Sequence, residues 1–202
     1  MLKAHTMYAP FAVLPIFDQD FLTGSAMGAI LKDITIVQAF LHNLPELQDI
    51  ARKTFAESFA AYNTPEDMQH YLEVNLGQAQ LELELSEEGS FFYLVKKEGI
   101  LIGYLKINST PGKEAAHTEK GFELERIYLL KAYQQHGIGQ LLFDFAKSMA
   151  AESGADYLWL GVWEQNTGAI RFYERNGMQQ FGAHSFMLGK DRQTDILMRL
   201  NV

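Results

Sequence analysis

A glycine-rich turn between a strand pattern and a helix pattern sets the strongest limit on how this chain can fold. Residues 122–130 alternate in polarity and are rich in strand formers, which predicts a strand. After the turn at residues 134–139, apolar side chains recur on one helical stripe as far as Met149, and Gly154 stands where a C-terminal cap is expected. A strand that leads into a helix through glycines gathers free backbone N–H groups at one point. The pattern therefore predicts an α/β domain with an anion site at the turn.

Three phosphate-binding patterns compete for this turn. A Walker loop requires Gly-Lys-Ser/Thr, which is absent. A dinucleotide fingerprint requires a small residue three positions after Gly139, but Leu142 occupies that position. The pattern that does fit is Gln-x-x-Gly-x-Gly, from Gln134 to Gly139. A tight turn that binds no ligand would need similar glycines, so this pattern leaves both interpretations open.

A second signal follows the predicted helix. Residues 157–163 are almost entirely apolar, as expected of a strand that is buried on both faces. Asn166 or Thr167 can cap the helix that comes next, and Gly177 can end it. Tyr173 lies within this predicted helix, either as a core side chain or as a phenol at a functional site.

The two signals, in this order, resemble the pyrophosphate motif and the closing motif of the GNAT acetyltransferases. The resemblance implies an α/β (α+β) GNAT fold, with a mixed central sheet of about seven strands, a splayed pair and helices on both faces. Further segments resemble the bacterial Pai-type spermine/spermidine N-acetyltransferases, which implies a polyamine acceptor and acetyl-CoA as co-substrate. These segments are residues 54–59, 63–66, 124–128, 159–164, 182–189 and 193–195.

The resemblance also implies roles for individual residues. A run in the glycine turn would hold the pyrophosphate of acetyl-CoA: Gln135, His136, Gly137, Ile138, Gly139 and Gln140. A backbone donor for the thioester oxygen would come from Ile127, Tyr128 and Leu129. In the closing motif, Asn166 and Tyr173 would contact the pantetheine or sulfur end, and Arg175 would reach the CoA phosphates.

The absence of cysteine limits the chemistry. The chain has no cysteine, which excludes a cysteine acyl-enzyme, so direct transfer in a ternary complex is the simplest course. Tyr173 is the candidate acid for the leaving thiolate, and Glu125 is the candidate base. Glu123 shares a strand face with Glu125 and could bind a substrate cation, although both could equally be surface charges. The six histidines show no metal-ligand spacing, so we expect no metal site.

Charge and hydropathy limit the classes of partner that this chain can bind. A net charge of −8 disfavours sequence-independent binding to nucleic acid and is compatible with a cationic acceptor. No apolar run reaches the ~18 residues expected of a membrane span. We therefore expect a cytoplasmic monomer or homodimer with a small-molecule amine acceptor and no direct nucleic-acid or membrane partner. Two alternatives stay open: acetylation of a peptide or another small amine, and a regulator that binds acyl-CoA without turnover.

Residues 27–202 are expected to form the GNAT domain, and residues 1–26 an N-terminal extension. The extension faintly imitates a signal peptide, but Pro10 and Pro15 interrupt its apolar patch.

Within the domain we expect a strand at residues 30–37 and then two helices, the second with a start signal at Thr64. Strands at 91–96 and 100–108 would pair as a hairpin across residues 97–99, and residues 109–120 would form a polar loop. The strand at 122–130, a helix, the strand at 157–163 and a further helix follow, and strands at 179–188 and 194–200 would form a second hairpin. Residues 78–88 are ambiguous, because three leucines alternate although the composition favours a helix.

Overall fold

A computed structural model describes residues 33–109, 121–188 and 191–202. In chain order the elements are β1 (Ile34–Ala39), η2 (Leu41–Asn43), α2 (Leu44–Phe59), α3 (Pro65–Val74), α4 (Gln78–Ser86), β2 (Ser90–Lys97), β3 (Ile100–Asn108), β4 (Gly121–Leu129), η3 (Lys131–Tyr133), α5 (Ile138–Glu152), β5 (Tyr157–Trp163), α6 (Thr167–Arg175), β6 (Gln179–Leu188) and β7 (Asp191–Asn201).

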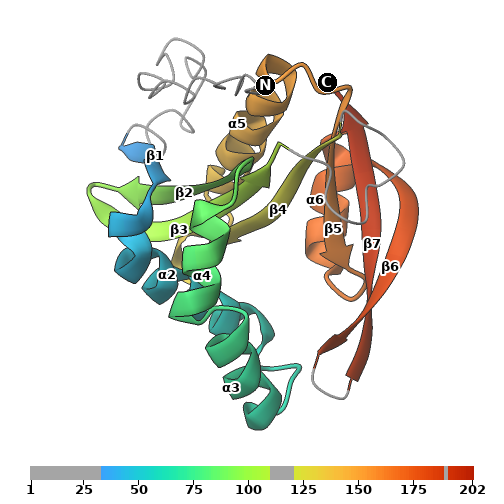
Figure 1. The fold of residues 1–202 in the computed structure, drawn as a ribbon. Helices are drawn as coiled ribbons and strands as arrows, with labels where there is room; N and C mark the ends of the chain where they lie inside the picture. Colours follow the sequence, from blue (N-terminus) through green and yellow to red (C-terminus); the bar gives the residue numbers. More distant parts are fainter. Residues whose placement is uncertain (1–32, 110–120, 189–190) are drawn as a thin grey trace, which may run out of the picture.

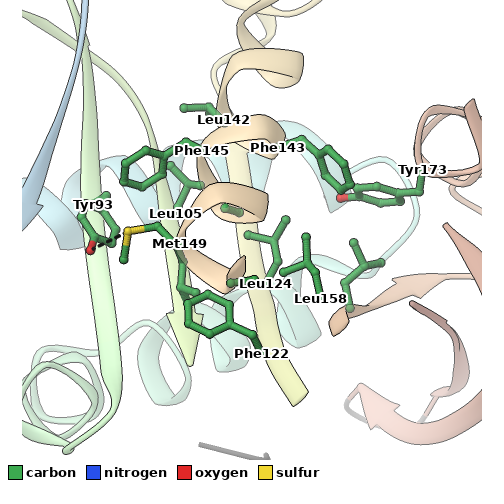
Figure 2. Close-up of a cluster of buried hydrophobic side chains, with 14 of the residues drawn as sticks. Tyr93, Leu105, Phe122, Leu124, Leu142, Phe143, Phe145, Met149, Leu158 and Tyr173 are labelled. Atoms are coloured by element: carbon green, nitrogen blue, oxygen red, sulfur yellow. Dashed lines mark hydrogen bonds between the residues drawn. The ribbon is translucent and has the colours of Figure 1, made fainter. Parts of the chain in front are cut away.

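The strands form one mixed sheet with helices on both faces (Figure 1). Its seven strands run in the order β1-β2-β3-β4-β5-β7-β6, and β4 and β5 are the parallel neighbours among antiparallel pairs. Alternation along β2 divides the core. Phe92 and Leu94 pack with residues of α2 and α4, whereas Tyr93 and Val95 pack with α5 on the opposite face. Figure 2 shows Tyr93 beside Met149 and Phe145 of α5. The seven-stranded mixed sheet confirms the predicted fold class.

The pair β4 and β5 is splayed. The ladder between them covers only residues 121–123 on β4 and residues 157–159 on β5, and it ends at the pair Glu123 and Trp159. Beyond that pair, β4 continues to Leu129 and β5 continues to Trp163 without pairing to each other. Parallel strands need a crossover, which α5 supplies. The predicted splay is therefore confirmed, and it opens toward the ends of both strands.

Several local predictions are confirmed by their hydrogen bonds or backbone angles. Thr64 caps α3 by accepting a bond from the backbone N–H of Asp67, with proline at the first helical position. The hairpin between β2 and β3 turns through Glu98 and Gly99, both with positive φ, as tight hairpins require. Gly154, with φ of +73°, follows α5 as expected.

The structure differs from the prediction chiefly in one added helix and one strand boundary. Residues 78–86 form a third helix, α4, so three helices rather than two separate β1 from β2. Leu81 is buried there while Leu83 is 68% exposed, a difference that an alternating strand on one face would not give. Strand β7 begins at Asp191, three residues before the predicted Thr194.

Some predictions fall outside the described residues. They include the extension at residues 1–26, the first residues of the opening strand predicted from Ile30, and most of the polar loop predicted at 109–120. Within the described residues, no helix combines the length and apolar character needed to cross a bilayer.

Candidate active site

The glycine turn lies between the end of β4 and the start of α5, and two bonds anchor it. The side-chain amide of Gln134 donates to the Leu129 carbonyl oxygen at 3.0 Å. The carboxylate of Glu57, on α2, accepts from the backbone N–H of Lys131 at 2.7 Å. Between these anchors and the helix, Gln135 and Gly137 both have positive φ, at 64° and 79°. A left-handed conformation is costly for a residue with a Cβ, so the strain at Gln135 marks the turn as a candidate functional feature.

Gly139 occupies the first turn of α5, and a Cβ there would face open space. A Cβ built on Gly139 has nothing within 4 Å, so packing of the protein does not explain the missing side chain. Its neighbour Ile138 is buried and fixes the start of the helix. The first backbone N–H groups of a helix lack intrahelical partners, so this end of α5 can bind an anion at close range.

Gln140 has a structural task at the same helix end. Its backbone N–H donates to the Gly137 carbonyl oxygen at 3.1 Å. Its side-chain amide donates to Asn176 at 2.6 Å and to Asp144 at 3.0 Å. Because Asn176 caps the end of α6, this side chain fixes α6 against α5.

Helix α6 places Tyr173 in the core beside α5. Asn166 caps the helix by accepting a bond from the backbone N–H of Ala169 at 3.1 Å. The Tyr173 ring lies 6.0 Å from Phe143, centroid to centroid, and Figure 2 shows the two rings side by side. Burial raises the pKa of the Tyr173 phenol above its ordinary value of 10.0, so the phenol holds its proton at neutral pH. Arg175 is exposed in the last turn.

The end of β4 presents backbone groups to the splay. Ile127, Tyr128 and Leu129 pair with β3 on one side, and the ladder to β5 has already ended at Glu123. Successive N–H groups of a strand point to opposite sides, so some of them face the splay. Gly103 allows β3 to lie close to β4 here, because a Cβ on it would be 2.3 Å from the Tyr128 carbonyl oxygen.

A β-bulge places Glu125. Ile107 pairs with Leu124 and Lys106 pairs with Arg126, so Glu125 is the extra residue on β4. The side-chain amide of Asn108 lies 2.7 Å from a carboxylate oxygen of Glu125 and 2.7 Å from one of Glu123. The two glutamates therefore share one face of the sheet, as the sequence predicts.

The same carboxylate belongs to an ion-pair network that is mostly buried. Lys106 Nζ lies 2.7 Å from Glu125 and 2.9 Å from Glu84, a residue of α4. Arg126 contacts Glu84 with both terminal nitrogens, at 2.9 and 3.1 Å, and Glu125 at 3.1 Å. The side chains of Lys106 and Glu84 are 6% and 8% exposed, whereas that of Glu125 is 28% exposed. Glu125 is thus the most open member of the network.

Sequence reasoning missed Glu84, Lys106 and Arg126. Burial would raise the pKa of the Glu84 carboxyl, but attraction to Arg126 and Lys106 outweighs it, and the pKa is lowered below 4.5. The available signal was a lysine flanked by apolar residues within the predicted strand at 100–108. Its partner lies on a helix of ambiguous pattern, so the pairing could not be assigned.

These parts meet around the splay from opposite faces of the sheet. Tyr173 and α5 lie on one face of the sheet. The Glu125 network lies on the other face, which α2 and α4 cover. A ligand anion at α5 and a ligand on the other face could therefore approach each other between β4 and β5. Among residues 33–109, 121–188 and 191–202, no three His, Asp or Glu side chains are grouped so that they could hold a metal ion.

The chain is similar in sequence to known proteins. A family model described as the acetyltransferase (GNAT) family matches residues 44–178. An uncharacterized N-acetyltransferase in the pepI 3′ region of Lactobacillus delbrueckii subsp. lactis is 43% identical over 84% of this chain and 98% of its own. An uncharacterized N-acetyltransferase of Mycobacterium tuberculosis is 28% identical over 76% of this chain and 94% of its own.

A solved structure shares the fold. It is the PaiA N-acetyltransferase of Thermoplasma acidophilum in complex with coenzyme A. The TM-score is 0.67 at 21% identity, and the match covers 84% of this chain and 99% of that chain. At this identity the likeness supports the fold.

Proposed function

The chain belongs to the GNAT family of acetyltransferases and is an acetyl-CoA-dependent N-acetyltransferase, and on this premise we propose that its acceptor is a polyamine. In this proposal the enzyme moves the acetyl group to a primary amine of a spermidine- or spermine-like molecule, by direct transfer in a ternary complex. The resemblance of its sequence segments to the Pai-type enzymes supports this acceptor class.

The observation that carries the acceptor class is the acidic pair at the start of the splay. Glu123 and Glu125 are held together by Asn108 at the point where β4 separates from β5. A carboxylate that remains partly open at this point would attract an ammonium group and favour a cationic acceptor. The net charge of −8 also favours approach of a polycation.

The proposed co-substrate site uses the N-terminus of α5. Residues 135–140 would surround the pyrophosphate, chiefly through backbone N–H groups, and the open space at Gly139 supports such close approach. Asn166 and Tyr173 would lie at the pantetheine and sulfur end, and Arg175 would reach the CoA phosphates. Since Gln140 already bonds to α6, its contribution would include fixing the helix that carries Tyr173.

The proposed chemistry follows from these positions. The neutral acceptor nitrogen attacks the thioester carbon, and a backbone N–H of residues 127–129 stabilises the developing oxyanion. Glu125 takes the proton from the nitrogen through a water molecule. The carbon–sulfur bond then breaks, and Tyr173 gives its proton to the thiolate, so that the products are an acetamide and CoA with a free thiol. The Tyr173 phenolate regains a proton from solvent, and Glu125 releases to solvent the proton that it took from the nitrogen, so both residues return to their starting states.

Replacing Gly139 by leucine is expected to raise the Kd for acetyl-CoA at least about tenfold, equivalent to 1.4 kcal/mol. The new side chain would occupy the space through which the pyrophosphate approaches the helix. The same change should leave the free energy of unfolding unchanged or raise it by up to about 1 kcal/mol, since leucine is a better helix former than glycine. Calorimetric titration and chemical denaturation measure the two effects.

Gly154→Leu is the matched control for this variant. Gly154 lies beyond the other end of α5 with φ of +73° and also has no atom within 4 Å of a built Cβ. Leucine there should lower stability by about 1–2 kcal/mol through backbone strain, while acetyl-CoA affinity stays normal. Normal affinity in Gly139→Leu would contradict the proposed pyrophosphate site.

The acceptor proposal is tested by steady-state CoA release with spermidine, spermine, short diamines, aminoglycosides and lysine peptides. We expect kcat/KM to be highest for the polyamines. Preference for a lysine peptide or an aminoglycoside would contradict the polyamine proposal and leave the acetyltransferase assignment intact. Binding of acetyl-CoA without turnover of any amine would favour a regulator.

A further inference from the structure

Three of the segments that resemble Pai-type enzymes converge at the outer end of the splay. The first ends α2, the second ends β5, and the third lies on β7, so they are distant in sequence. The Phe59 ring lies 6.0 Å from Trp163 on β5 and 6.3 Å from Tyr128 on β4, and it therefore bridges the two splayed strands. Trp163 pairs in register with Asp195. These contacts have no part in the transfer chemistry described above.

The aromatic part of this region is open to solvent on one side. Tyr62 packs edge-on against Trp163 with centroids 5.3 Å apart, yet the Tyr62 residue is 64% exposed. The loop that carries Tyr62 is held over β7, because Gln193 donates to Asn63 at 3.4 Å. The indole Nε1 of Trp163 is buried and has no hydrogen-bond partner in the part of the chain that the structure describes. The aromatic cluster therefore meets solvent chiefly at the Tyr62 ring.

The acidic part of the region comes from β7. A Cβ built on Gly161 would lie 3.4 Å from Asp195 Oδ2, so the Asp195 carboxylate lies above Gly161, two residues before Trp163 on the same face of β5. The phenol of Tyr71, on α3, is influenced electrostatically by both this carboxylate and Glu125. Burial chiefly raises the pKa of Tyr71; Arg126 lowers it, and Glu125, Glu84 and Asp195 raise it further. Carboxylates from both sides of the splay therefore act on the same hydroxyl.

We propose that Phe59, Tyr62 and Trp163 hold the alkyl chain of the acceptor while Asp195 binds its distal ammonium group. The site then selects acceptors that carry a second positive charge separated by an alkyl spacer from the reacting amine. This inference rests on the proposed function, which places the reacting amine at Glu125.

The chemistry of such an acceptor matches the region. Methylene groups next to an ammonium group pack well on aromatic rings, and tryptophan has the strongest cation–π attraction among them. A carboxylate can accept several hydrogen bonds, so Asp195 can bind an ammonium group and keep bonds to its own neighbours. A monoamine would make none of these distal contacts. Its affinity should therefore be lower, although its reacting nitrogen is the same.

The test compares Asp195→Asn, Trp163→Leu and Trp163→Phe with wild type, using spermidine and n-butylamine as acceptors. For Asp195→Asn we expect the KM for spermidine to rise on the order of tenfold, with the KM values for butylamine and acetyl-CoA unchanged, because a charge-assisted bond to the distal ammonium is lost. Trp163→Leu should raise the spermidine KM similarly, and Trp163→Phe should raise it less, following the strength of the cation–π attraction.

Asp49→Asn is the matched charge control, since Asp49 is an exposed partner of Lys53 on α2 and should leave every constant unchanged. Thermal unfolding of each variant shows whether it folds. Equal increases in the butylamine and spermidine KM values, or no increase for spermidine in Asp195→Asn, would overturn the inference while polyamine acetylation stands. If wild type acetylates no polyamine, the inference and the proposed function both fail.

Discussion

Replacing Tyr173 by phenylalanine is expected to lower kcat by a factor on the order of 10², the lower end of what a positioned general acid contributes. The substitution removes only the hydroxyl, and Phe143 and Phe172 still pack against the ring. Acetyl-CoA affinity should therefore stay within about twofold of wild type, because the proton is needed only as the thiolate leaves. Steady-state kinetics and calorimetric titration separate these two effects.

The pH dependence of the Tyr173 variant supplies a second check. Because burial raises the pKa of Tyr173 above 10.0, the phenol is protonated throughout the range from neutral to mildly alkaline pH. The ratio of wild-type to variant kcat should therefore be constant over that range. Tyr93→Phe is the control, since this tyrosine belongs to the same core and its hydroxyl contacts Met149 sulfur at 3.9 Å (Figure 2). Full activity in Tyr173→Phe would contradict the proposal that Tyr173 protonates the leaving thiolate.

Replacing Glu84 by glutamine should destabilise the fold by about 3–5 kcal/mol, the usual cost of removing one partner from a buried ion pair. Glutamine keeps the shape but leaves Arg126 and Lys106 with Glu125 as their remaining carboxylate in the network. Chemical denaturation at neutral pH measures the change. Glu82→Gln, on the exposed side of α4, is the control and should alter stability by less than about 0.5 kcal/mol.

Lowering the pH should reduce the difference in unfolding free energy between wild type and Glu84→Gln. The folded-state pKa of Glu84 is lowered from 4.5, so its contribution to stability is fully present above that value and is lost as pH falls through the lower folded-state pKa. The gap in unfolding free energy between wild type and Glu84→Gln should therefore narrow below pH 4.5. A gap that stays constant into strong acid would show that charge pairing of Glu84 is not its source.

Local sequence patterns predict much of the fold. The capped start of α3 at Thr64, the hairpin at Glu98 and Gly99, and the strand, glycine turn and helix around Gly137 are each encoded within a few residues. Each depends on one strong local rule: a cap, a positive φ, or a change from the strand period to the helix period. These local rules give the elements and their order, and the family resemblance supplies the splayed mixed sheet that they build.

The acidic side of the site depends on features that local patterns do not show. The bulge at Glu125 is a mismatch between two strands, so it appears only when the registers of β3 and β4 are known. Glu84 is buried on a helix whose leucines alternate, and its burial depends on Lys106 and Arg126 from other strands. A buried charge looks like a surface charge until its partners are located.

The region around Trp163 could not be predicted because it depends on contacts between residues that are distant in sequence. Its segments are individually recognisable, but their meeting depends on contacts such as that between Asn63 and Gln193, which are 130 residues apart. The splay itself explains why they meet. Once β5 leaves β4, the end of β5 needs another packing partner on that face. Phe59 at the end of α2 and Tyr62 in the loop after it supply this partner.

The most direct measurement is the identity of the product. Purified protein would be incubated with acetyl-CoA and spermidine, and the spermidine would be analysed by mass spectrometry while free CoA is measured in parallel. We expect monoacetylated spermidine to accumulate in a 1:1 ratio with CoA, and Tyr173→Phe to form it far more slowly. Unmodified spermidine after prolonged incubation with protein that demonstrably binds acetyl-CoA would contradict the assignment of this chain as a polyamine acetyltransferase.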